Sequence, residues 1–112
     1  MDTTERARQV VEAIQIARGR WPIGAGFTVS VRGGCAACDP GACAECGHLF
    51  TGEIYTIEHL TRGKRVISDR TVHYLSHGIT RYETGYVVRG EPVVVEIDLE
   101  DLAGYLDLSI AS

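Results

Sequence analysis

Apolar residues recur at helical intervals near the start of the chain. A helix over residues 3–18 would place several of them on one face. Asp2 and Glu5 have the spacing of a capping box, in which side chains bond the free backbone N–H groups of a helix N-terminus. The chain is therefore expected to begin with an amphipathic helix. The residues on its apolar face are Val10, Ile14 and Ala17.

Alternating apolar and polar residues predict several strands further along the chain. These segments are residues 27–31, 54–60, 65–67, 86–88 and 93–97. The turns expected at 61–64 and 89–92 are short, so each joins two neighbouring strands as an antiparallel hairpin. Hairpins of this kind build a mainly antiparallel sheet.

Two further helices are expected, over residues 69–77 and 99–106. Ser68 or Asp69 can cap the first of these helices, and Gly78 suits a left-handed residue at its C-terminal end. Asp98 can cap the second. The order of elements predicts one small α+β domain over residues 1–112, with a helix at each end and a metal-binding loop after the first strand.

Four cysteines lie in this loop with the pattern C-x2-C-x4-C-x2-C. Each C-x2-C pair can direct two sulfurs toward one centre, and the Asp39-Pro40-Gly41 turn can fold one pair onto the other. Four thiolates at about 2.3 Å from one Zn²⁺ would form a closed, structural site. The predicted zinc-binding loop spans residues 35–48, and its ligands are Cys35, Cys38, Cys43 and Cys46.

Other chemistries also fit parts of this loop. The spacing Cys38-x4-Cys43-x2-Cys46 matches a plant-type iron–sulfur loop, although no cysteine follows position 46. The fourteen residues 35–48 also resemble a zinc knuckle in spacing, with Cys and His exchanged at the last two positions. The loop lacks the aromatic and basic residues with which knuckles bind bases. Reactive thiols remain an alternative, and disulfides are disfavoured because a reducing compartment is expected.

Histidines and arginines supply further candidate site residues. His48 can support the metal as a hydrogen-bonding neighbour of the ligands. His73 and His77 share a face of the expected second helix, where they can form a separate metal site or act as acid–base groups. A solvent-exposed pair is the simpler interpretation. The turn residues Arg62, Lys64 and Arg65 are candidates for contact with an anion or a partner.

Composition and charge narrow the function classes. The 112 residues are 45% hydrophobic, but no apolar run reaches the roughly 18 residues needed to cross a membrane. The first ten residues lack the pattern of a secretory signal, which predicts a cytoplasmic protein. The net charge is −4, and the acidic part is residues 66–112, with three Lys/Arg against eight Asp/Glu. Nucleic acid is therefore disfavoured as a partner, although local contact through Arg32 and the 62–65 turn stays an alternative.

These observations favour a small zinc-stabilised binding or adaptor protein without an evident catalytic centre. Its partner is expected to be a protein, including a second copy of the chain joined through an edge strand such as 93–97. One alternative is a metal- or histidine-dependent enzyme that uses His73 and His77. Another is a thiol or iron–sulfur redox sensor based on the cysteine loop.

Overall fold

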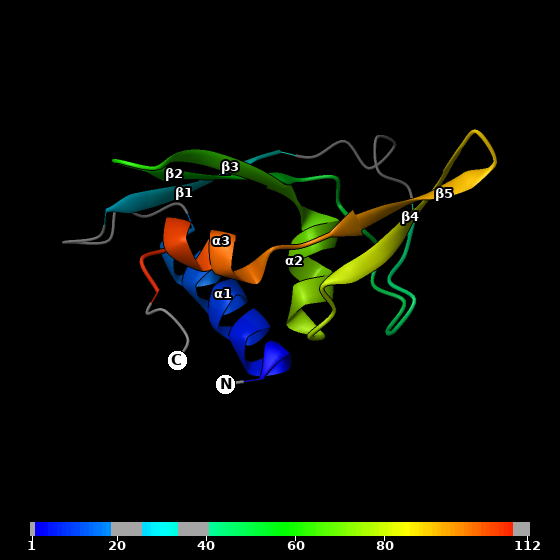
Figure 1. Ribbon diagram of the computed structural model, residues 1–112, viewed down its shortest axis with the longest axis horizontal. Coiled ribbons are helices and arrows are strands. Elements are labelled where there is room, and N and C mark those ends of the chain that lie inside the picture. The colour runs from blue at the N-terminus through cyan, green and yellow to red at the C-terminus, as the bar shows by residue number, and fades with distance from the viewer. Residues whose placement is uncertain (1, 19–25, 34–40, 109–112) are drawn as a thin grey trace.

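The computed structural model describes residues 2–18, 26–33 and 41–108. Within these ranges the helices and strands follow the predicted α+β order (Figure 1). The helices are α1 (Thr3–Ala17), α2 (Asp69–Ser76) and α3 (Leu99–Tyr105). The strands are β1 (Phe27–Arg32), β2 (Ile54–His59), β3 (Gly63–Ser68), β4 (Arg81–Val88) and β5 (Glu91–Glu96).

Each helix begins at a side-chain cap that the sequence predicts. The carboxylate of Asp2 accepts from Glu5 N at 2.8 Å, and that of Asp98 accepts from Asp101 N at 3.1 Å. Ser68 Oγ accepts from Thr71 N at 3.2 Å at the start of α2. Gly78 ends α2 with φ +79°, a left-handed conformation that costs glycine little. These caps explain why the predicted and observed helix boundaries agree closely.

The antiparallel strands divide into two sheets, which the hydrophobic pattern alone does not reveal. Strands β1, β2 and β3 form one sheet in that order, and β4 and β5 form a separate hairpin. Helices α1 and α3 lie under one face of the three-stranded sheet (Figure 1). The larger hydrophobic core fills this space and includes Val10, Ile14, Ile57, Leu75 and Leu102.

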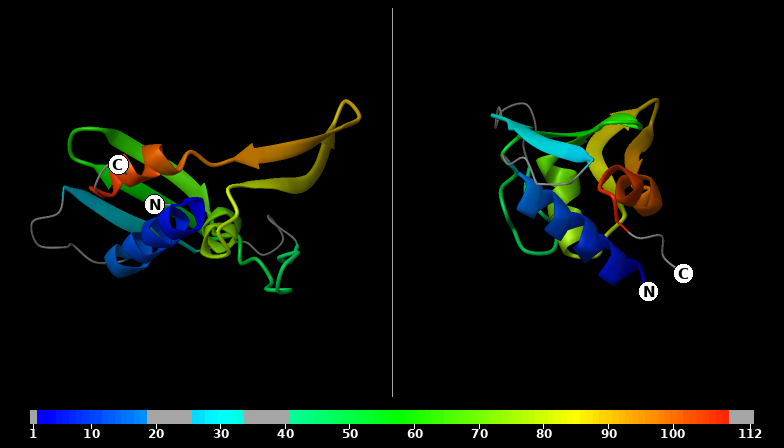
Figure 2. Two further views of the ribbon diagram at one scale, coloured as in Figure 1. Left: turned by 60° about the horizontal axis from the view of Figure 1, so that its bottom comes forward. Right: turned by 90° about the vertical axis from the view of Figure 1, so that its left-hand side faces the viewer.

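The β4–β5 hairpin, called the arm below, extends away from the sheet and helices (Figures 1 and 2). Its turn has positive φ at Arg89 and Gly90, as a two-residue hairpin turn requires. Strand β4 starts at Arg81, five residues before the predicted start at position 86. The first half of β4 was not predicted because Tyr82 is the one buried side chain among its described residues, and because its register shifts between Glu83 and Val87.

A smaller core joins the cysteine loop, α2 and the base of the arm. Its buried residues are Cys43, Phe50, Tyr74 and Tyr82. The rings of Tyr74 and Tyr82 stack with centroids 4.6 Å apart, and the Tyr82 hydroxyl lies 2.8 Å from Thr71 Oγ1 in α2. Arg70 also donates to the Thr84 carbonyl of β4 at 2.8 Å. Helix α2 therefore connects the larger core to the arm.

Candidate metal centre

The loop from Gly41 to Phe50 folds back on itself and holds two cysteines. Cys43 N donates to the His48 carbonyl at 2.8 Å, and Gly47 N donates to the Cys43 carbonyl at 2.8 Å. Gly47 has φ +76°, which permits the tight reversal after Cys46. Glu45 N also lies 3.4 Å from Cys43 Sγ as a donor. Backbone donors of this kind stabilise the negative charge of a thiolate.

Helix α2 supplies two histidines to the same place. His73 and His77 are four residues apart, so a helix brings their side chains to one face. The Nε2 atoms of the two imidazoles lie 3.2 Å apart. His73 Nε2 also lies 3.3 Å from Cys46 Sγ. The loop and the helix thus meet through their metal-ligating side chains.

Together, Cys43, Cys46, His73 and His77 offer four donor atoms that all lie within 4.8 Å of one another. In a tetrahedral zinc site with Zn–N of about 2.0–2.1 Å and Zn–S of about 2.3 Å, neighbouring donor atoms lie about 3.3–3.8 Å apart. The His73–His77 and Cys46–His73 separations fall close to this range. The group can hold one metal ion.

Hydrogen bonding alone accounts poorly for this convergence. A neutral imidazole nitrogen carries either one proton or one lone pair. His73 Nε2 is nevertheless close to both Cys46 Sγ and His77 Nε2. One cation at the centre of the group would interact favourably with every donor atom at once. The geometry therefore fits metal binding better than a chain of pairwise hydrogen bonds.

The environment of His73 favours the neutral, metal-binding form of imidazole. Burial lowers the pKa of His73 below its ordinary value, and the charges of His48 and His77 lower that pKa further. Because a proton and a metal ion compete for the same nitrogen lone pair, a lowered pKa leaves that nitrogen available at neutral pH.

His48 lies beside the group rather than within it. Its ring stacks on the ring of His73, with centroids 4.4 Å apart and planes 11° from parallel. Its Nε2 atom lies 4.0 Å from the Asp69 carboxylate. Phe50 contacts the His73 ring edge-on, with centroids 5.9 Å apart. These neighbours fix the orientation of His73, and the position of His48 agrees with a supporting role.

The other predicted site residues are the first cysteine pair and the basic residues of the turn at 62–65. Cys35 and Cys38, the first pair of the predicted four-cysteine site, lie outside the described residues. Arg65 donates to Asp101 at 2.9 Å and lies over the Tyr105 ring, and that hydrogen bond raises the pKa of Arg65. Arg62 accepts from the Tyr105 hydroxyl through its carbonyl at 2.7 Å, and Lys64 is exposed. A surface ion pair with Asp101 therefore already engages Arg65.

Comparisons with protein-family models, curated proteins and solved structures found no match to this chain. Among the described residues, no helix combines the length and the apolar character that crossing a membrane requires.

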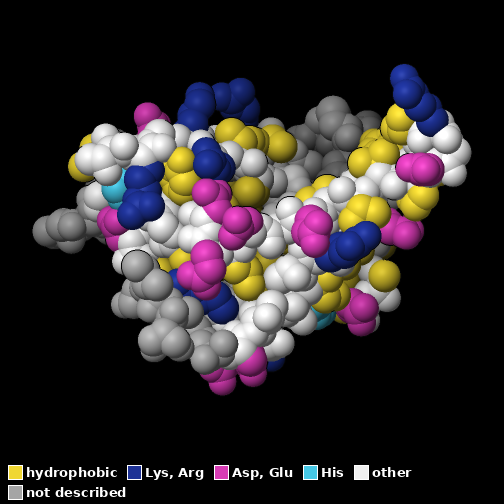
Figure 3. All heavy atoms as spheres, viewed as in Figure 1, with side chains coloured by type: hydrophobic (Ala, Val, Ile, Leu, Met, Phe, Trp, Pro, Cys, Tyr) yellow, Lys and Arg dark blue, Asp and Glu magenta, His cyan; other side chains and the backbone are white. Residues whose placement is uncertain are grey.

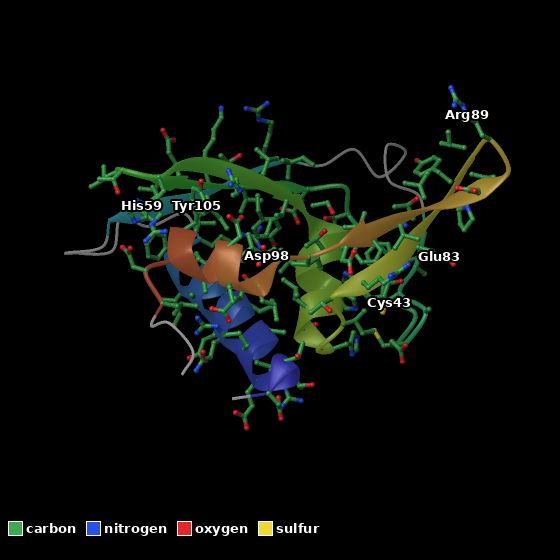
Figure 4. All side chains as sticks on the ribbon, in the orientation of Figure 1. Cys43, His59, Glu83, Arg89, Asp98 and Tyr105 are labelled. Atoms are coloured by element: carbon green, nitrogen blue, oxygen red, sulfur yellow. The ribbon has the colours of Figure 1, made fainter. Side chains whose placement is uncertain are left out.

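The sequence predicts the cysteine loop and the histidine pair as separate sites, whereas the structure brings Cys43 and Cys46 of the loop to His73 and His77. Cys43 lies on the loop below the base of the arm, far from His59 and Tyr105 at the other end of the molecule (Figure 4). The helical spacing of His73 and His77 was the available signal. Their distance in sequence from Cys46 hid the connection, because only the tertiary fold brings the loop to α2.

Proposed function

We propose that this protein is a small metal-stabilised binding module whose ion is zinc. The observation that carries the proposal is the convergence of Cys43, Cys46, His73 and His77 within 4.8 Å. Two thiolates and two imidazoles form a common tetrahedral donor set for structural zinc. The ion would tie the loop to α2, where the small core alone buries few side chains.

One zinc ion is favoured over an iron–sulfur cluster by the compactness of the group. A two-iron cluster needs donor atoms arranged around two ions, whereas these four donors all lie within 4.8 Å of one another, a spread that suits one ion. Zinc also accepts sulfur and nitrogen ligands equally well. A cytoplasmic location, where thiols remain reduced, is part of this proposal.

A structural role is favoured over an enzymatic one because four protein ligands fill a tetrahedral shell. A catalytic zinc keeps one position for water or substrate. In the enzyme alternative, His73 and His77 would instead be free to exchange protons or bind a reactant. Their closeness to Cys46 makes them ligands of the same ion in this proposal.

Metal analysis of variants tests the ligand set. The full chain, made without added metal, is expected to hold one zinc per chain and to lack visible absorption. The paired change His73→Ala with His77→Ala should abolish this zinc, whereas Cys35→Ser with Cys38→Ser should retain it. Loss of zinc only in the second variant would support the four-cysteine site and overturn the Cys2His2 assignment.

Cobalt substitution gives an independent measure of the ligands. Tetrahedral Co²⁺ absorbs visible light, and its sulfur-to-metal charge-transfer band grows with the number of thiolates. The Cys43→Ser and Cys46→Ser variants should each reduce that band by about half, since two thiolates are expected in the site. A reduction by about a quarter would indicate four thiolates instead.

The arm is the binding surface in this proposal. Tyr86, Val87 and Val88 are 57%, 65% and 58% exposed, and apolar side chains extend along the arm in Figure 3. Exposed apolar patches on small proteins commonly mark interaction sites. The net charge of −4 argues against nucleic acid as the ligand. A protein partner is the occupant that fits this apolar surface best.

A second copy of the chain is the partner that the charges of β4 favour. Glu83 and Arg89 each lie three residues from Tyr86, on opposite sides. Two arms placed antiparallel about a twofold axis at Tyr86 would bring Arg89 of one copy beside Glu83 of the other. This self-complementarity would guide a symmetric dimer.

Light scattering combined with size-exclusion chromatography tests this dimer. The chain is expected to elute as a dimer whose fraction rises with protein concentration. Val88→Glu should shift it to monomer, and Leu60→Glu, at an even more exposed apolar position outside the arm, should not. A monomer at every concentration would reject self-association, and equal effects of both variants would place the interface outside the arm.

A further inference from the structure

The two sulfurs of the proposed zinc site differ in accessibility. Cys43 is only 3% exposed and belongs to the smaller core with Phe50 and Tyr82. Cys46, three residues later in the same loop, is exposed. A reagent dissolved in water therefore reaches Cys46 first.

We propose that Cys46 is a modification site for hydroperoxides and that its oxidation releases the metal. The proposal rests on the proposed function, because zinc binding keeps both cysteines as thiolates. The thiolate is the nucleophilic form of cysteine, and oxidation follows thiolate character and exposure. Cys46 combines both properties, whereas Cys43 has only the first.

The reaction proceeds in two steps. The Cys46 thiolate attacks one peroxide oxygen and the O–O bond breaks, so that Cys46 becomes a sulfenic acid; hydroxide leaves from hydrogen peroxide and alkoxide from an organic hydroperoxide. The Cys43 thiolate then attacks Cys46 Sγ, an S–S bond forms, and the S–O bond breaks with loss of hydroxide. The two sulfurs together lose two electrons, which the peroxide receives.

The geometry suits the second step. The two sulfurs lie within 4.8 Å of each other and are separated by only two residues in a turn. Cys43 is also shielded from competing thiols by its burial. The resulting disulfide is uncharged and binds zinc poorly, so His73 and His77 would be left as the only donors from the described group.

Trapping of the sulfenic acid tests the order of events. Zinc-loaded Cys43→Ser and Cys46→Ser variants, each also carrying Cys35→Ser and Cys38→Ser, are treated with hydrogen peroxide and dimedone. The adduct is expected on Cys46 at a rate at least about tenfold above that of Cys43 in the matched variant. Equal or reversed rates would overturn the assignment of Cys46.

The unmodified chain provides a second measurement that requires no variant. Hydrogen peroxide should release zinc to a chromophoric chelator with the same time course as disulfide formation. Cleavage after Glu45 separates Cys43 from Cys46 in sequence, so a Cys43–Cys46 disulfide would hold the two peptides together in mass spectrometry. A disulfide elsewhere, or zinc retained after complete oxidation of both cysteines, would reject the proposal.

Zinc content before oxidation separates the two proposals. A chain that holds no zinc at the start contradicts the proposed function. A chain that holds zinc through His73 and His77 but reacts first at Cys43 contradicts only the inference about Cys46.

Discussion

At the scale of single residues, His73 depends on its neighbours for its orientation. One face of its ring carries the stacked His48 ring, and Phe50 meets it edge-on. Its Nε2 atom is directed at the other donor atoms of the group. Neighbours that hold a metal-binding imidazole in place contribute to affinity without touching the ion.

The His48→Ala variant should therefore bind zinc about 10- to 100-fold more weakly than the parent chain. His73→Ala should lose more, because it removes a ligand. His59→Ala, at the far end of the molecule, is the control and should leave zinc affinity unchanged. Competition with a chromophoric chelator measures all three affinities. Equal losses for His48→Ala and His73→Ala would show that His48 is itself a ligand.

His59 has a different role, because it bonds the Asp107 carboxylate. Thr61 N donates to His59 Nδ1 at 3.1 Å, so the ring proton lies on Nε2 and is donated to Asp107 at 2.8 Å. Gly26 N donates to the same carboxylate at 3.0 Å. These bonds lower the pKa of Asp107 below its ordinary value of 3.8, and the bond from His59 has the largest effect. The charged form of Asp107 thus stabilises the fold.

This shift sets the sign of a pH effect. A carboxylate with a lowered folded-state pKa contributes stability above pH 3.8, and that contribution is lost as pH falls through the folded pKa. Asp107→Asn, which tolerates the positive φ there, should be less stable than the parent at neutral pH. In urea unfolding, the difference in the free energy of unfolding between the parent and Asp107→Asn should shrink below pH 3.8. In a His59→Gln background, the same difference should be small at every pH. A constant difference would contradict this.

At the scale of elements, α1 and α3 are joined by an ion pair between a buried Arg6 side chain and a Glu100 side chain that is 56% exposed. The Arg6 side chain is 5% exposed and donates to both carboxylate oxygens of Glu100 at 3.1 Å. Arg6 also donates to Gln9 at 3.0 Å. A buried guanidinium that loses its carboxylate partner keeps the cost of its own desolvation.

Glu100→Ala should therefore lower the free energy of unfolding by about 1–3 kcal/mol, since Arg6 would retain only part of its hydrogen bonding. The matched control is Asp101→Ala, the next residue of α3, whose pair with Arg65 lies at the surface. Loss of this surface pair should lower the free energy of unfolding by less than about 1 kcal/mol. Urea unfolding at constant metal occupancy measures both variants. A control as destabilised as Glu100→Ala would mean that charge at the helix N-terminus dominates.

The sequence predicted the elements well because each has a local cause. Apolar spacing placed the strands, and the caps at Asp2, Ser68 and Asp98 fixed where the helices begin. Tertiary features lacked such local causes. Arg6 is buried, although a charged side chain is normally expected at the surface. The contact between Cys46 and His73 depends on how the loop folds against α2. Spacing identified the residue types able to bind metal but not their grouping.

At the scale of the whole molecule, α2 is shared by two cores. Val72 and Leu75 pack into the larger core beneath the sheet, whereas Tyr74 packs into the smaller one with Cys43 and Phe50. The larger core has many buried side chains from α1, α3 and the sheet, so it can persist without the metal. Among the residues that the structure describes, the smaller core buries only four and relies on the loop, which the proposed zinc would hold in place.

Removal of zinc should consequently act on one end of the molecule. Hydrogen–deuterium exchange of the chelator-treated chain should accelerate in the loop at 43–50, in the last turn of α2 and at the base of the arm. Amides of β2 and of α1 around Ile14 should stay protected, because their burial does not depend on the loop. His59→Ala, treated in the same way, should show the same zinc-dependent pattern. Exchange that rises uniformly over the chain would mean that the two cores unfold as one unit.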